Sequence, residues 1–204
     1  KVGRVIARPY IGTKKGHFTR TSNRHDYALA PFSKTALDSL KDAGLDVIGV
    51  GKIPDIFVDQ GITRKIKTVS NEDGMNKTIE LASDNFNGLA FINLVDFDAV
   101  YGHRRNAAGY GKAIEEFDVQ LGELINELKN DDLLMVTADH GNDPTYRGTD
   151  HTREQVPLII YSKQFNEMKV LNDSNSFGII GSTICDNFNV KYNGIGSSIL
   201  ELLK

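Results

Sequence analysis

A chain of 204 residues is long enough for one domain of ordinary size with a substantial core. A net charge of −3, with no long block of either sign, makes nucleic acid and anionic membranes unexpected partners. No apolar run approaches the roughly 18 residues of a membrane helix, and the lone Cys185 excludes an internal disulfide. With no signal-peptide pattern, this composition predicts a cytoplasmic protein. Because the first residue is Lys1 instead of Met, we expect the chain to begin inside a longer protein.

The first thirty residues predict one strand followed by a loop. Residues 2–7 form a short apolar run that ends before Pro9, which favours a strand. Residues 11–27 are polar and basic and contain glycines, which is typical of a loop. His17 and His25 belong to this loop, and we interpret both as solvated or phosphate-facing.

From residue 31 onward, apolar strands alternate with helices. The expected strands cover residues 46–51, 88–95, 132–138 and 156–161. The expected helices cover residues 33–44 with Ser33 as N-cap, 75–82, about 109–128, 177–188 and 197–203. The clearest helix carries an apolar stripe: Ile114, Phe117, Leu121, Leu124, Ile125 and Leu128. This alternation predicts an α/β fold with a parallel sheet covered on both faces.

Aspartate and histidine side chains gather after two of the predicted strands. The candidates for metal binding are Asp98, His103, Asp139, His140 and His151. Ligands bind beyond the carboxyl ends of the strands in such sheets, and these residues fall there. Carboxylate and imidazole ligands suit Mn²⁺, Mg²⁺ or Zn²⁺. Two such ions, about 3.5–4 Å apart, can hold a nucleophile and a phosphoryl group together.

Other interpretations of these residues are possible. A lone Asp-His pair is more often a surface pair than a ligand pair. The joint pattern favours metal, because three of the five histidines lie next to aspartates at or beyond strand ends. Asp96 also follows a strand, but we interpret it as capping the loop or orienting a ligand.

Several segments around these residues resemble the alkaline phosphatase superfamily and, within it, the phosphopentomutase family. The string from Thr137 to Asn142 is shared with cofactor-independent phosphoglycerate mutases. The more specific likeness lies in residues 18–28, 51–56, 93–98, 101–105 and 148–154. The resemblance runs over nearly the whole chain.

The resemblance implies an alkaline-phosphatase-like core with a mostly parallel sheet flanked by helices, plus the remnant of an inserted cap domain. Residues 31–204 would form the C-terminal part of the metal-binding core, and residues 1–30 the last portion of the cap. Two Mn²⁺ ions are implied, with Mg²⁺ or Zn²⁺ as alternatives. One ion would be held by Asp98, His103 and His151. The other would be held by Asp139, His140 and an aspartate near the family's N-terminus.

The family interconverts α-D-ribose 1-phosphate and ribose 5-phosphate, and the deoxyribose equivalents. A phosphorylated threonine would give its phosphoryl group to the sugar, so the reaction would pass through a bisphosphate. Ribose 1,5-bisphosphate or glucose 1,6-bisphosphate would be the activator. The positions that match substrate contacts are Arg4, Ile6, Arg20 and Lys52. Without the resemblance, each Arg or Lys would be a solvated charge and Ile6 a buried strand residue.

The chain departs from the family pattern at its beginning. Neither the N-terminal aspartate nor the threonine nucleophile can be assigned, so no catalytic residue is assigned and the missing N-terminal part of the same protein is an expected partner. We predict that these 204 residues alone have no mutase activity. Two alternatives stay open. One is another metal-dependent mutase or phosphatase of the superfamily, and the other is a non-catalytic module that binds one ion.

Overall fold

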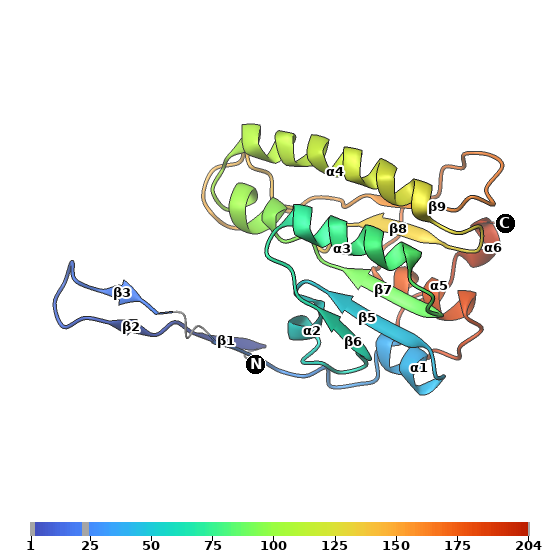
Figure 1. Ribbon diagram of the computed structural model, residues 1–204, viewed down its shortest axis with the longest axis horizontal. Helices are drawn as coiled ribbons and strands as arrows, with labels where there is room; N and C mark the ends of the chain where they lie inside the picture. Colours follow the sequence, from blue (N-terminus) through green and yellow to red (C-terminus); the bar gives the residue numbers. More distant parts are fainter. Residues whose placement is uncertain (1–2, 22–24, 204) are drawn as a thin grey trace.

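The computed structural model describes residues 3–21 and 25–203, and its first strands form two narrow ribbons. Strand β1 (Arg4–Ala7) pairs antiparallel with β4 (His25–Ala28), and β2 (Tyr10–Ile11) pairs antiparallel with β3 (Thr19–Arg20). Figure 1 shows β2 and β3 extending away from the main body. The expected loop over residues 11–27 is therefore wrong in part. Strands of two to four residues are too short for the alternation that identifies a strand.

The main sheet has β5 (Asp46–Val50) at its centre, between β6 (Arg64–Ile66) and β7 (Gly88–Ile92). All three strands run parallel, as the alternation predicted. Four of the five residues of β5 are buried, which is typical of a strand covered on both faces. Strand β6 was not predicted, because it is three residues long and two of them are charged.

Of the helices in the described residues, five lie close to the predicted positions, and a short helix at residues 53–56 was not predicted. Their bounds are α1 (Ala36–Asp42), α2 (Ile53–Ile56), α3 (Asn71–Ser83), α4 (Ala107–Glu127), α5 (Gly178–Asn187) and α6 (Leu200–Leu203). The N-cap of α1 is Thr35 and not Ser33, because Thr35 forms a reciprocal capping box with Asp38. In the described ranges, no helix has both the length and the apolar composition that a membrane span requires.

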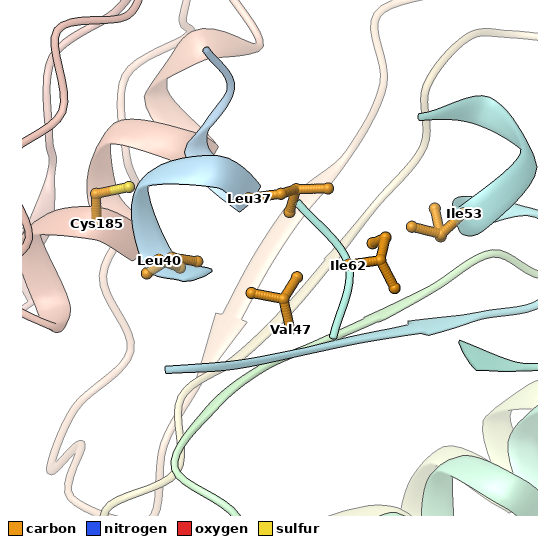
Figure 2. Packing of buried hydrophobic residues seen from close by; sticks show 6 residues of the cluster. All are labelled: Leu37, Leu40, Val47, Ile53, Ile62 and Cys185. Carbon is orange, nitrogen blue, oxygen red and sulfur yellow. The ribbon is translucent and has the colours of Figure 1, made fainter. Parts of the chain in front are cut away.

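Apolar side chains pack on both faces of β5. On one face, Val47 packs with residues of α1, α2 and α5, as Figure 2 shows. The buried residues of this cluster are Leu37, Leu40, Val47, Ile53, Ile62 and Cys185. On the other face, Ile48 and Val50 pack with Leu81 of α3. Successive side chains of a strand point to opposite faces, so β5 contributes to both clusters, and β7 does the same through Leu89 and Ala90.

The apolar stripe of α4 is confirmed for Leu124, which is 5% exposed, but not for Ile114, which is 49% exposed. Ala113 is buried in its place. Ala113 and Leu124 are eleven residues apart, close to three turns, so they lie on the same line of the helix. The buried face of α4 is therefore rotated by one residue from the predicted stripe at its beginning.

Strands β8 (Leu134–Thr137) and β9 (Leu158–Tyr161) form an antiparallel pair. This corrects the expectation of a parallel arrangement for these two strands. A parallel pair needs a crossover connection, usually a helix. Residues 138–157 contain no helix, so the chain returns antiparallel. The connection carries three of the candidate metal ligands.

Candidate metal centre

Three candidate ligands meet beyond the carboxyl end of β7. The Oδ1 atom of Asp98 lies 3.4 Å from Nε2 of His103 and 3.3 Å from Nε2 of His151. The two Nε2 atoms are 3.2 Å apart. Ligand atoms about 2.1 Å from one ion, at tetrahedral or octahedral angles, stand roughly 3.0–3.4 Å from one another. The donor set and its spacing therefore suit a single divalent ion.

A π-helical turn, η1 (Phe97–Gly102), brings Asp98 and His103 to the same side. The backbone N–H of His103 donates to the carbonyl of Asp98 at 2.9 Å, which is a π-type bond between residues five apart. In an α-helix, residues five apart would point about 140° away from each other. The wider turn thus makes the five-residue spacing of these two side chains suitable for one ion.

His140 lies beside this trio, whereas Asp139 lies at its rim. The ring of His140 stacks on that of His151, with centroids 3.8 Å apart. One ligand atom each from Asp98, His140 and His151 lie within 4.8 Å of one another. The side chain of Asp139 is 75% exposed, and its Oδ2 is 3.8 Å from Nε2 of His140. The division of these residues between two ions stays a prediction.

In His103 and His140, contacts with backbone carbonyls determine which ring nitrogen carries the proton. The Nδ1 atom of His103 lies 2.6 Å from the carbonyl of Thr149, and Nδ1 of His140 lies 3.2 Å from that of Gly141. A carbonyl only accepts, so Nδ1 is the donor in both rings and Nε2 carries the lone pair when the ring is neutral. The Nε2 lone pair of His103 then faces Asp98 and His151. A lone pair on His103 Nε2 beside the Asp98 carboxylate is a donor set that suits a divalent cation.

Asn142 forms a hydrogen bond with Asp98, a role that the sequence did not predict. Its side chain is buried, and Nδ2 donates to Oδ1 of Asp98 at 2.6 Å. Gly102 makes room for this amide, because a Cβ there would lie 2.5 Å from Nδ2 of Asn142. The sequence showed Asn142 next to the Asp-His-Gly string, but no spacing rule links it to Asp98, 44 residues earlier.

Asp96 was predicted to cap the loop or orient a ligand, and its carboxylate binds the backbone at the start of α3. Its Oδ2 accepts from the backbone N–H of Asn71 at 2.7 Å, and its own N–H donates to Oδ1 of Asn71 at 2.9 Å. These bonds tie the end of β7 to the first turn of α3. Asp96 and Asp98 therefore have different roles: Asp96 binds the N-terminus of α3, whereas Asp98 faces the two histidines.

The charge of Asp98 also affects a neighbouring tyrosine. Tyr110 of α4 packs against Phe97, with ring centroids 5.6 Å apart. Burial raises the pKa of the Tyr110 phenol, and the carboxylate of Asp98 raises it further. The phenol therefore stays neutral beside the cluster at physiological pH.

The predicted substrate residues lie in two places. Lys52 lines an open cavity of about 820 Å³ beyond the carboxyl ends of β5, β6 and β7, which Asp96 also lines. Arg4 and Ile6 belong to β1, and Arg20 to β3, so the structure does not bring them to the metal-ligand candidates. Ile6 is half-buried and Arg4 exposed, and the side chain of Arg20 lies outside the described part of the structure.

Comparison with known proteins gives close relatives for the whole chain. The phosphopentomutase of Agathobacter rectalis is 60% identical over 205 residues. Those of Clostridium botulinum and Clostridium tetani are 59% and 58% identical. Each alignment covers 100% of this chain and 52% of the relative. The chain thus spans about half the length of the curated relatives it matches.

A solved structure supports the fold. The PH0037 protein from Pyrococcus horikoshii superposes with a TM-score of 0.53 at 17% identity, over 68% of this chain and 38% of that one. Likeness at this identity shows the fold alone, and it agrees with the predicted α/β architecture. The profile of the metalloenzyme superfamily matches residues 8–192. The chain therefore belongs to the metalloenzyme superfamily, and the similarity to phosphopentomutases inferred from its motifs is confirmed.

Proposed function

We propose that this chain works in a phosphopentomutase, which interconverts α-D-ribose 1-phosphate and ribose 5-phosphate and their deoxyribose equivalents. The observation that carries the proposal is the trio of Asp98, His103 and His151. Their ligand atoms lie 3.2–3.4 Å apart at the end of β7. The chain around them is 58–60% identical to named phosphopentomutases.

The trio would hold one Mn²⁺, and Asp139 with His140 would contribute to a second. Bound divalent ions would neutralise the charge that develops on a transferring phosphoryl group. Asp98 supplies a negative oxygen, and Asn142 holds that oxygen in place with a hydrogen bond. Asp139, which is mostly exposed, is free to face a ligand that approaches from solvent. A further aspartate would come from the part of the relatives that this chain does not cover.

Lys52 would bind a phosphate of the substrate in the cavity beyond β5, because an ammonium group acts as a point charge on phosphate. Arg4, Ile6 and Arg20 would contact the substrate from the ribbons β1–β4 and β2–β3. Strand β3, which carries Arg20, extends away from the main body (Figure 1), so we propose that these residues act when the complete protein folds around its ligand. Ribose 1,5-bisphosphate or glucose 1,6-bisphosphate would serve as activator.

The phosphorylated threonine would lie in the half of the relatives outside this chain. One covalent residue that acts as donor and acceptor would let an isomerisation proceed by phosphoryl transfer. We therefore expect the 204-residue chain alone to lack turnover. The cytoplasmic location stays a prediction from composition.

A substrate panel tests the proposal on the natural full-length protein. With Mn²⁺ and catalytic bisphosphate, we expect ribose 5-phosphate to form from α-D-ribose 1-phosphate, and a chelator to abolish the reaction. 3-Phosphoglycerate is the control, because the Thr137–Asn142 string is shared with phosphoglycerate mutases. Turnover of 3-phosphoglycerate but not pentose phosphate would favour another mutase of the superfamily. Metal binding without turnover of either compound would favour a binding module.

A further inference from the structure

The guanidinium group of Arg105 lies half-buried between the two loops that carry the candidate ligands. Its Nε donates to the carbonyl of Gly148 at 2.5 Å, and one terminal nitrogen to that of Asp150 at 2.5 Å. The other terminal nitrogen donates to the Asp143 carbonyl at 2.7 Å, Asn142 Oδ1 at 2.8 Å and the Gly102 carbonyl at 3.2 Å. All three guanidinium nitrogens are therefore engaged, and four of the five acceptors are oxygens of loop residues, the fifth being Gly102 at the end of η1.

Three of these acceptors belong to one segment, residues 143–150, which directly precedes His151. The segment has neither helix nor strand, and a single backbone bridge between Gly141 and Thr152 joins the residues on either side of it. Arginine offers donors in a rigid planar fork, which can hold several carbonyls at once. The segment also accepts a hydrogen bond from His103 through Thr149. The place of His151 relative to His103 and Asp98 therefore depends on the bonds of Arg105 together with the bridge at Thr152.

Arg105 also acts on Asp98 through the amide of Asn142. A guanidinium only donates, so it must meet the Oδ1 of Asn142, and an ionised carboxylate only accepts, so it must meet the Nδ2. Both bonds are present, at 2.8 and 2.6 Å, and together they fix the orientation of the amide. The oxygen of Asp98 that receives Nδ2 is the one that lies 3.3–3.4 Å from the two histidines.

The backbone of Arg105 adds an independent observation. Its φ is 53°, in the left-handed region that favours glycine. Glycine would adopt this turn with less strain, so the backbone alone gives no reason for an arginine. The side-chain bonds offset the strain. Arg104, the preceding residue, is exposed, and it gives a matched control of the same type.

We propose that Arg105 is a positioning residue of the metal centre, which fixes the His151 segment and the Asn142 amide so that the ligand atoms of Asp98, His103 and His151 meet. The inference rests on the proposed metal-dependent function. It assigns Arg105 no contact with substrate. Its effect should therefore appear in metal affinity and in the order of residues 143–151.

The first experiment measures Mn²⁺ affinity by calorimetry in the full-length protein, with four variants. Arg105→Gly keeps the left-handed backbone and removes the guanidinium, so we expect 10- to 100-fold weaker binding, roughly the range for lost hydrogen-bond partners of ligands. Arg105→Lys should lose less, because one ammonium reaches fewer carbonyls. Arg104→Ala should bind like the parent. Saturating Mn²⁺ should restore most of kcat in Arg105→Gly, but not in Asp98→Ala.

The second experiment follows amide exchange in the metal-free protein. The amides of Tyr146 and Thr152 donate to the carbonyls of Asp143 and Gly141. They should exchange faster in Arg105→Gly than in the parent, and at the parental rate in Arg104→Ala. Parental Mn²⁺ affinity and parental exchange in Arg105→Gly would overturn the inference. If Arg105→Gly does not fold, Arg105→Lys decides in the same way. A parent that binds no Mn²⁺ would instead contradict the proposed function, while the exchange result would still decide whether Arg105 orders the segment.

Discussion

The sheet around β5 and the loops beyond β7 and β8 are held together by different interactions. Around β5, Leu40, Val47 and Val50 are fully buried and belong to clusters of apolar side chains. In the loops, Asn142 and Arg105 hold the candidate ligands through hydrogen bonds to carbonyl and carboxylate oxygens. Removing volume from the apolar clusters should lower the stability of the fold. Removing a hydrogen bond of the loops should instead change the positions of the candidate ligands. Substitutions in the two regions should therefore be separable by experiment.

The largest effect on stability should come from Leu40→Ala. The side chain is 0% exposed and belongs to the cluster of Figure 2, so its removal leaves a cavity. We expect the free energy of unfolding to fall by about 2–5 kcal/mol, measured by denaturant titration. Val119→Ala is the control, because Val119 is 64% exposed and should change stability by about 0.5 kcal/mol or less. Equal effects of the two substitutions would contradict the comparison.

The largest effect on function without loss of stability should come from Asp98→Asn. The change removes a charge that faces two imidazoles at 3.3 and 3.4 Å. We expect Mn²⁺ affinity to fall by about 100-fold or more, beyond the usual cost of losing a supporting hydrogen bond, and activity to be nearly lost. Asp96→Asn is the matched control and should do less damage, because Asp96 binds the N-terminus of α3. The reverse order would show that Asp96 is the ligand.

An intermediate effect is expected from Gly102→Ala. The added methyl group would lie 2.5 Å from Nδ2 of Asn142, so the amide must move away from Asp98. We expect Mn²⁺ affinity to fall about 10-fold, measured by calorimetry. Gly111→Ala is the control, since no atom lies within 4 Å of the new Cβ in this helix. It should gain up to about 1 kcal/mol of stability. An unchanged metal affinity in Gly102→Ala would show that the amide does not support Asp98.

The smallest effect should come from Asp38→Asn in the first turn of α1. Burial would raise the pKa of Asp38, but hydrogen bonds from Gln60 and Thr35 outweigh it and hold the pKa below the ordinary value of 3.8. A lowered pKa means that the ionised form stabilises the fold above pH 3.8, and that this is lost as pH falls through the folded-state pKa. We expect a loss of about 0.5–1 kcal/mol at pH 7.

A pH series checks the sign of this last effect. Denaturant titrations of the parent and of Asp38→Asn should differ at pH 7 and converge as the pH falls below 3.8. A difference that grows towards acid would mean that the carboxylate destabilises α1.

Long-period patterns made much of the fold predictable from the sequence. Strands β5 and β7 and helices α3 and α4 carry enough apolar residues to identify each element and its period. Strand β6 and helix α2 have three and four residues, which is too few for either signal. Strand β9 runs antiparallel to β8 because no crossover helix connects them. The apolar pattern of β9 itself carries no information about this direction.

The candidate site was predictable where chemistry follows a strand end, and not where loops meet. Asp98 and His103 could be paired because they share one short segment. Arg105 and Asn142 are 37 residues apart, and only the packing of their loops brings them into contact. The sequence does not distinguish a solvated arginine from one that donates to five oxygen atoms, so the role of Arg105 could be inferred only from the structure.

The ribbons β1–β4 and β2–β3 have a practical consequence for work on the protein. They expose large apolar side chains, among them Tyr10, Ile11 and Phe18. Tyr10 and Phe18 make an edge contact with each other, with ring centroids 4.9 Å apart. Two-stranded ribbons are marginally stable, and apolar strand edges can pair with other chains. We therefore expect residues 1–204 prepared by themselves to aggregate during purification, and detergent or dilute solution to keep them dispersed.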